Sequence, residues 1–365
     1  MKIRRYHPIV LLAAAALGSG CARMTALQEP EPVAIAFSVS AGDYLATRAE
    51  GEIPTDEVLR AGSGFGVFAC YTGAHKYSES SVSPDFMYNQ RVTYNPGIPA
   101  WEYRPVKYWP NGEGEPVGET GENPHYVSFF AYAPYSDGTS QPCIPSFSLP
   151  YEQSNPWLIY RLADDPAQQV DLLYAEPMLD QTKGKTGDRM EFTFRHALSC
   201  VGDTVSVQCS DALKDKFAAQ FALGLNDKIE LLLTHFSINY TLTQKGRLVL
   251  WTQGGANWQP VRSEGSTVSR TVDMLDTEYV LYSQEGATLS VQEWRSTGKG
   301  IFFIPLDLDA YPQRAVVTLS YLIRRTAGIS ISETAETLEK ILVLKDHYED
   351  GEKLDIDITL DNINP

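Results

Sequence analysis

Short apolar runs of strand length, separated by clusters of Gly, Pro and Asn, recur along this 365-residue chain and restrict its fold more than any other feature. Residues 65–71 and 126–133 are dense apolar and aromatic runs, and residues 190–201 alternate cleanly between apolar and polar. Alternation with a period of two is typical of β-strands. Only the segment that follows Ser210 has the apolar spacing of a helix, and a parallel α/β sheet needs many helices. We predict an all-β protein of two β-sandwich domains with one short helix.

The length of the chain favours about two domains, because a single hydrophobic core rarely grows past roughly 250 residues. Residues 183–187, with the sequence Lys-Gly-Lys-Thr-Gly, form the most linker-like stretch near the middle. We therefore expect an N-terminal domain at 49–187 and a C-terminal domain at 188–365.

The first twenty residues have the composition of an export signal. Basic residues precede an apolar run at 9–17, and small residues stand at 18–20. This pattern predicts a secretory signal peptide at 1–20, which is too short to remain as a membrane-spanning helix. The Ser-Gly pair followed by Cys21 is similar to a bacterial lipobox, which predicts lipidation at Cys21, and acyl chains there would anchor the exported chain to a membrane. The alternative is an ordinary signal peptidase site at which Cys21 is incidental.

The charge of the chain excludes one class of partner. It carries 46 acidic against 30 basic residues, a formal charge of −16. Phosphate groups need Lys and Arg to neutralise them, so we expect no nucleic-acid partner.

Motifs for catalysis and cofactors are incomplete. Residues 184–186 resemble the end of a phosphate-binding loop, but the glycine needed five residues earlier is absent. The glycine-rich residues 62–66 precede a strand, whereas a dinucleotide loop follows one. The six histidines are scattered, and the aspartates near the C-terminus lie on an alternating strand, which favours a solvated face over a calcium loop. We expect no enzymatic activity, no cofactor and no metal.

Four cysteines follow the signal region: Cys70, Cys143, Cys200 and Cys209. An exported chain with four cysteines can form two disulfides in three connectivities. A hairpin turn expected at residues 202–203 would keep Cys200 and Cys209 from facing each other. We favour free, buried cysteines, while the disulfide state stays open.

Aromatic residues crowd one region of the first half, among them Trp101, Tyr103, Tyr108 and Trp109. One interpretation is a stacking platform for sugars, which would make the chain a glycan-binding module or tip adhesin on a host or bacterial surface. The other is ordinary packing in the core of a sandwich, which we favour.

Two segments near the ends of the chain share one pattern, four apolar side chains on one face of seven residues. These are Val33, Ile35, Phe37 and Val39 in the first segment, and Leu354, Ile356, Ile358 and Leu360 in the second. Either segment can fill the same row of four pockets. The simplest interpretation is that both are ordinary strands of one monomer.

A basic site follows the first segment, with Arg48 directly before Ala49. Cleavage there would release the first strand and leave an apolar groove, which is a liability unless another strand pairs with it. The strand at 354–360 of a neighbouring copy can supply that pairing. The same contact repeated head to tail gives an open filament.

Several motifs, taken together, resemble the fimbrillin family, the lipoprotein pilins of Bacteroides-type bacteria. In the first half these are FGVFA at 65–69, FMYNQ at 86–90 with VT at 92–93, WEYRPVKYWP at 101–110, VSFFAYAP at 127–134, DLLYA at 171–175 and FTFRHALS at 192–199. The second half is similar more loosely, through its strand pattern and GEKL at 351–354.

The resemblance implies two transthyretin-like β-sandwich domains and an outer-membrane lipoprotein that is exported to the cell surface as part of a fimbrium. It also implies cleavage by an arginine-specific protease and polymerisation with other pilin subunits, of the same or another kind, by donor-strand exchange. Carried over by position, Cys21 is the lipidation site, Arg48 and Ala49 flank the cleavage site, and 21–48 is a lipidated pro-segment with the removable first strand. The donor strand is then 354–360.

Overall fold

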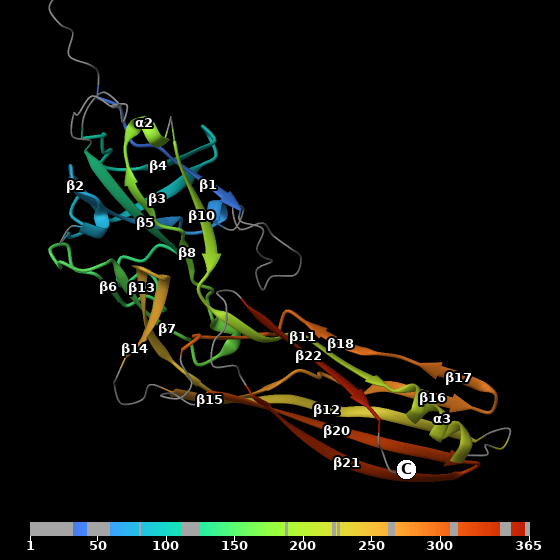
Figure 1. The fold of residues 1–365 in the computed structure, drawn as a ribbon. Helices are drawn as coiled ribbons and strands as arrows, with labels where there is room; N and C mark the ends of the chain where they lie inside the picture. The colour runs from blue at the N-terminus through green and yellow to red at the C-terminus, as the bar shows by residue number, and fades with distance from the viewer. Residues whose placement is uncertain are drawn as a thin grey trace, which may run out of the picture.

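The computed structural model describes residues 32–41, 59–79, 82–110, 125–186, 189–220, 224, 227–261, 267–306, 313–343 and 352–361. Over these ranges the chain consists mainly of β-strands, which confirms the all-β prediction (Figure 1). None of the helices within them is long and apolar enough to cross a membrane.

An eight-stranded sheet forms most of the N-terminal part. Its order is β1, β10, β8, β5, β2, β3, β4, and β9 also pairs with β5. The bounds are β1 Phe37–Ala41, β2 Phe65–Gly73, β3 Met87–Asn95, β4 Ala100–Tyr103, β5 Tyr126–Ala133, β8 Leu173–Ala175, β9 Met178–Gln181 and β10 Met190–His196. The alternation seen in the sequence is the alternation of buried and more exposed side chains along β10.

The two ends of this sheet meet. The chain beyond β4 turns back, and Tyr108 forms an antiparallel bridge with Ala34, just ahead of β1. The sheet therefore curls round a hydrophobic core that includes Phe65, Phe129 and Phe192. β1 is the strand that joins the ends of the curled sheet.

A smaller four-stranded sheet completes the N-terminal part. Its strands are β6 Ser146–Phe147, β7 Trp157–Arg161, β13 Lys245–Thr252 and β14 Gly255–Pro260, in the order β14, β13, β7, β6. A second hydrophobic core joins it to the large sheet through Phe68, Tyr132, Leu158 and Leu248.

The C-terminal part is an elongated sandwich of two sheets. One sheet contains β11 Ser199–Cys209, β18 Trp294–Thr297, β19 Ile301–Phe303 and β22 Lys353–Leu360. The other contains β12 Lys228–Thr243, β15 Thr267–Asp273, β16 Tyr279–Glu285, β17 Thr288–Val291, β20 Arg314–Ala327 and β21 Ser330–Val343. Side chains such as Val205, Ile238 and Leu319 form the core between them.

The boundary expected between residues 187 and 188 is not where the sheets change. β10 pairs with β1 and β8, so it belongs to the N-terminal sheet. The chain passes to the C-terminal sandwich between β10 and β11. β13 and β14 then return to the N-terminal part, because β13 pairs with β7. Within the stretch expected to be a linker, residues 183–186 instead form α2 (Lys183–Thr186), a single helical turn.

The expected hairpin at residues 202–203 is also wrong, because β11 runs through it. Gly202 has a φ of +72°, a conformation that glycine adopts without strain. The register between β11 and β22 shifts between Val201 and Val205, so the glycine makes a bulge in a continuous strand. Cys70, Cys143, Cys200 and Cys209 are all free and buried.

The helix expected after Ser210 is α3 (Asp211–Gln220). The Ser210 hydroxyl accepts a hydrogen bond from the Leu213 N–H at 3.1 Å, which caps the helix. Leu213 and Phe217 are buried in the core of the C-terminal sandwich. With α2 and the 3-10 turns η1 (Tyr77–Glu79) and η2 (Pro166–Gln168), the chain has more helical turns than the one expected.

Candidate strand-binding groove

The strand expected to be removable lies inside the N-terminal core. Ile35 and Phe37 are each 2% exposed, and Val33 and Val39 are partly buried against the same core. All four inward positions of the segment therefore occupy apolar surroundings. Its removal would open a groove along the curled sheet.

Backbone hydrogen bonds hold this segment along both edges. On one edge β1 pairs in parallel with β10, from Phe37 opposite Met190 to Ala41 opposite Phe194. On the other edge the Ile35 N–H donates to the Lys107 carbonyl oxygen, and the Trp109 N–H donates to the Val33 carbonyl oxygen, each at 2.9 Å. The groove thus has donors and acceptors on both sides for an incoming strand.

The sequence alone does not identify residues 107–109 as the second edge of the groove. The run at 106–109 has the pattern of a short strand, but its pattern does not show that it lies against residues 33–35. Tyr103, at the end of β4, strengthens this edge, because its hydroxyl donates to the Ile35 carbonyl oxygen at 2.8 Å. Burial raises the pKa of Tyr103, so the hydroxyl keeps its proton and remains a donor.

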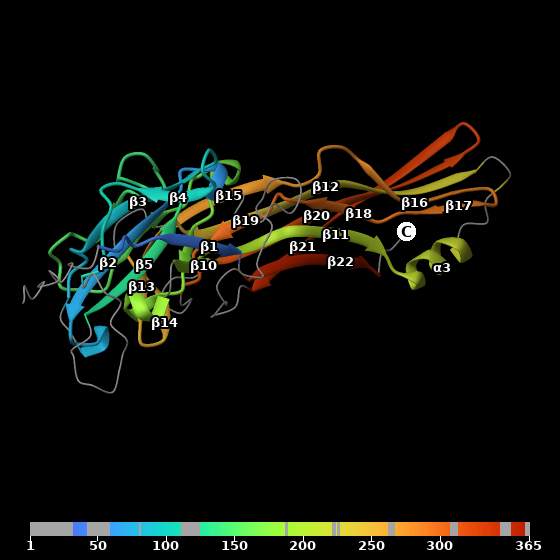
Figure 2. The ribbon, with the colours of Figure 1, turned by 90° about the horizontal axis from the view of Figure 1, so that it is seen from above.

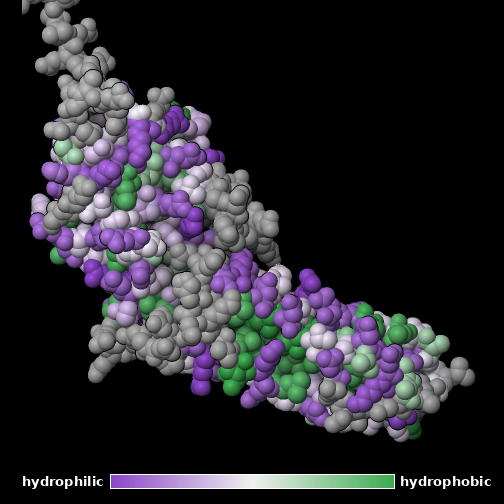
Figure 3. Space-filling model, in the orientation of Figure 1, coloured by the Kyte–Doolittle hydropathy of each residue, from purple (hydrophilic) through white to green (hydrophobic). Residues whose placement is uncertain are grey.

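The C-terminal segment is a strand of the C-terminal sandwich. β22 pairs in parallel with β11, and Ile356 and Leu360 are each 3% exposed in the core. Leu354 and Ile358 are partly buried against that core. Figure 3 shows hydrophobic surface on the C-terminal part in the region of β22.

The two terminal strands have equivalent positions. β10 leads almost directly into β11, and each carries one terminal strand in parallel: β1 beside β10 and β22 beside β11 (Figures 1 and 2). Both terminal strands also turn their inward side chains into a core. A strand with the pairing and pattern of β22 therefore has the geometry to lie where β1 lies.

The four aromatic residues considered for sugar stacking do not form a platform. Tyr103 and Trp109 are buried at 8% and 6% exposure, and only Tyr108 among the four is largely exposed, at 48%. Trp101 is partly buried, with its ring centroid 5.1 Å from that of Phe65. The curling of the sheet onto β1 turns most of this cluster inward, as the packing interpretation predicts.

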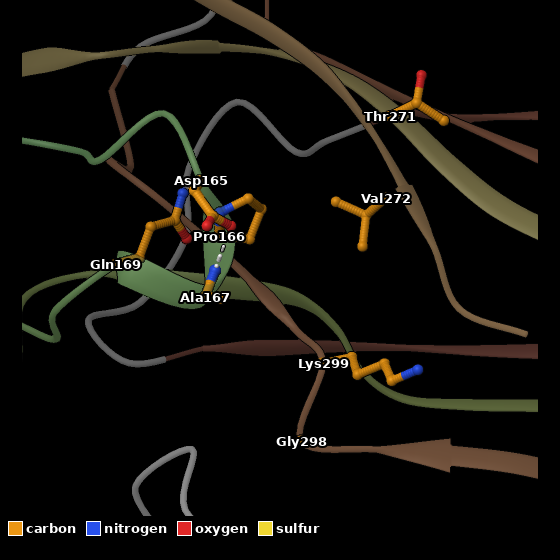
Figure 4. A pocket seen from close by; sticks show the side chains of 8 residues that line it. All are labelled: Asp165, Pro166, Ala167, Gln169, Thr271, Val272, Gly298 and Lys299. Atoms are coloured by element: carbon orange, nitrogen blue, oxygen red, sulfur yellow. Dashed lines mark hydrogen bonds between the residues drawn. The ribbon is translucent and has the colours of Figure 1, made fainter. Parts of the chain in front are cut away.

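A pocket of about 600 Å³ lies where the two parts of the molecule meet (Figure 4). Asp165 in its wall caps η2. The Gln169 side-chain oxygen accepts from the Phe302 N–H at 3.0 Å, and Lys299, which points away from Asp165, pairs with Asp276 at 3.1 Å. These polar groups are engaged in joining neighbouring segments, so we interpret the pocket as part of the junction.

Three of the predicted site residues, Cys21, Arg48 and Ala49, lie outside the described residues, as does the signal segment 1–20. Within the described ranges, no group of three or more His, Cys, Asp or Glu side chains is placed to hold a metal ion.

Comparison with known proteins agrees with the motifs. A sequence profile of the fimbrillin-like family matches residues 47–228, which confirms the resemblance. The fimbrium subunit Fim1C of Phocaeicola vulgatus is 22% identical over 250 residues. The aligned region covers 64% of this chain and 57% of that relative, so the match spans little more than half of the relative's length.

A fimbrial protein from Bacteroides vulgatus of known crystal structure shares the fold. It superposes with a TM-score of 0.61 at 18% identity, over 91% of this chain and 96% of the other. The superposition covers both parts of the molecule, so the arrangement described above is that of a known fold.

Proposed function

We propose, on the premise that residues 47–228 are fimbrillin-like, that this chain is a subunit of a cell-surface fimbria and assembles by exchange of β1. The observation that carries the proposal is the position of β1, which joins the ends of the curled sheet through residues 33–35 on one edge and β10 on the other. Its role is structural rather than enzymatic.

In this scheme the pro-segment reaches the cell surface attached through lipid on Cys21. An arginine-specific protease then cuts between Arg48 and Ala49. The cut separates β1 from the rest of the chain, so β1 is held by non-covalent contacts alone. Its departure exposes apolar pockets and two rows of backbone groups, and unpaired strand edges of this kind readily accept another strand.

The incoming strand is the C-terminal strand of a neighbouring subunit, of the same or another kind. In this chain that strand is β22, whose inward residues are Leu354, Ile356, Ile358 and Leu360. β22 already pairs in parallel with β11. Donation therefore exchanges one parallel pairing, that of β22 with β11, for another, that of the incoming strand with β10. Because the donor end and the acceptor groove lie on different surfaces, the contact is heterologous and repeats head to tail. It builds a filament when the rotation between successive subunits does not close a ring.

Replacement of Arg48 by Ala tests this scheme. We expect the Arg48→Ala chain to reach the surface and to remain monomeric, with β1 still attached. Arg23→Ala is the matched control, because a cut at Arg23 would not free β1. Surface protein is extracted and separated by size, and its N-terminal residue is determined. Polymerisation of Arg48→Ala at the wild-type level would refute cleavage as the trigger.

A further inference from the structure

The central aromatic side chain of β1 packs among four other rings. The ring centroid of Phe37 lies 5.3 Å from that of Tyr103, 5.5 Å from that of Phe192, and 6.2 and 6.4 Å from those of Phe129 and Phe65. The four neighbours stand on β4, β10, β5 and β2. Contacts between rings at such distances stabilise packing beyond the effect of buried area. The groove is therefore shaped for an aromatic side chain at this position.

The C-terminal strand of this chain has no aromatic side chain to place there. Its inward residues are aliphatic: Leu354, Ile356, Ile358 and Leu360. Whichever of them took the place of Phe37, the four rings would meet a side chain of different shape and smaller volume. Close-packed interiors lose stability when such space is left unfilled. This mismatch holds in every register that keeps the apolar side inward.

The outward face of the groove also restricts the register in which this strand can bind. β1 turns small uncharged residues outward, and Ser38 lies opposite Glu191 in the pairing with β10. The register that fills all four inward positions of the segment at 33–39 puts Thr359 in the place of Ser38. In the three other registers that put an apolar residue of β22 in the place of Phe37, an aspartate lies opposite Glu191. An aspartate opposite Glu191 is a like-charge pair, which destabilises strand pairing.

Two of these aspartates have partners where β22 now lies. The Asp355 carboxylate accepts a hydrogen bond from the Thr204 N–H at 3.2 Å, and the Asp357 carboxylate accepts one from the Ser206 hydroxyl at 2.6 Å. The outward face of β22 thus complements β11, whereas β10 presents Glu191 beside the groove. Shape in every register, and charge in all but one, match this strand to its own domain better than to the groove.

We propose that the groove left by β1 selects a donor strand from a different subunit over the C-terminal strand of another copy of this chain. The preferred strand carries an aromatic side chain where Phe37 lies and a small uncharged residue where Ser38 lies. This inference rests on the proposed exchange of β1 and adds the class of partner. The chain accepts an unlike subunit at its groove and so belongs to a mixed polymer.

Peptide binding to the cleaved protein tests this selectivity. Full-length protein is cut after Arg48 with an arginine-specific protease and mixed with fluorescent peptides, and binding is followed by fluorescence polarisation. The first peptide is residues 32–41, the second is the same peptide with Phe37→Ile, and the third is residues 352–361. Two further peptides are 352–361 with Ile356→Phe and Asp357→Ser, and 352–361 with Ile358→Phe and Thr359→Ser. The released strand competes equally with all of them.

We expect peptide 32–41 to bind at least about tenfold more tightly than its Phe37→Ile form and than peptide 352–361. We expect at least one of the doubly substituted peptides to regain most of that difference. Equal affinities of peptides 32–41, its Phe37→Ile form and 352–361 would overturn the selectivity and leave strand exchange intact. Failure of every peptide to bind, 32–41 included, would overturn the exchange itself.

Discussion

The hydroxyl of Tyr103 donates a hydrogen bond to the carbonyl oxygen of Ile35 at 2.8 Å. Tyr103 ends β4, at the opposite end of the sheet order from β1. The same hydroxyl accepts from the Lys107 N–H at 3.3 Å. One side chain therefore links the entry to β1 with the segment along its second edge, and both the core and this link oppose the release of β1.

Tyr103→Phe should loosen β1 without disturbing the aromatic packing. The variant keeps the ring and removes the donor to a buried carbonyl oxygen, a loss of about 1 kcal/mol. We expect amide exchange at Ile35 to rise about fivefold, and peptide 32–41 to replace β1 faster in protein cut after Arg48. Tyr108→Phe is the control, because Tyr108 is 48% exposed. Equal exchange rates in the two variants would show that the hydroxyl does not hold the strand.

The alkylation rate of the Cys209 thiol reports whether β22 remains in its own sandwich. It lies opposite Leu360 in the parallel pairing, and burial raises the pKa of the Cys209 thiol to about 11. At pH 7.5 the thiol should react slowly with iodoacetamide in the monomer. When β22 is donated to a neighbour, Cys209 loses its cover, and we expect alkylation to become at least about tenfold faster in the polymer.

Cys143 is the internal control for that measurement. Its thiol pKa is also raised to about 11 by burial, but it lies in the N-terminal part, in the core between the two N-terminal sheets. Peptide mass spectrometry separates the two sites in one sample. Slow labelling of Cys209 in the polymer would mean that β22 stays in its own sandwich, and equal acceleration at both cysteines would mean unfolding.

Local pattern was enough to predict the all-β fold and the α3 helix that follows Ser210. The four inward residues of each terminal segment were also predictable, because alternation along a strand is set by the backbone itself. The burial of Phe37 and Ile356 follows from that pattern once a core exists. These features depend on neighbours within a few residues of each other.

Pairing between distant segments was not predictable in the same way. The contact of residues 33–35 with 107–109 and the return of β13 to β7 join parts of the chain that are far apart in sequence. Gly202 signalled a turn because glycine allows a positive φ, but a bulge uses the same conformation. The aromatic cluster at 101–109 could be placed inside or outside only once the curl of the sheet onto β1 was known.

Trp101 should contribute to stability rather than to sugar binding. Its ring centroid lies 5.1 Å from that of Phe65 and 5.3 Å from that of Tyr94. Truncation of this partly buried ring in Trp101→Ala should lower the free energy of unfolding by about 2 kcal/mol, measured in urea. Tyr108→Ala should change it by less than about 0.5 kcal/mol. Glycan binding that is lost in Trp101→Ala at unchanged stability would restore the stacking interpretation.

Substitutions at Ile356 and Ile358 should distinguish the stability of the subunit from its ability to donate a strand. Ile356 is 3% exposed in the C-terminal core, whereas Ile358 is only partly buried there. Ile356→Asp buries an unpaired charge in the monomer and should destabilise it strongly, while Ile358→Asp should be milder. In a neighbour's groove both positions turn inward, so both variants should fail to donate.

Ile358→Asp is therefore the informative variant, and Thr359→Asp is its control, because Thr359 is exposed on the outward face of β22. We expect Ile358→Asp to retain most of the monomer's resistance to urea and yet to be depleted from fimbriae collected from cells, where Thr359→Asp is incorporated. A charge at 358 is tolerated while one side of the strand borders solvent, and it is not tolerated when that side closes against a core. Incorporation of Ile358→Asp at the wild-type level would exclude β22 as the donor strand.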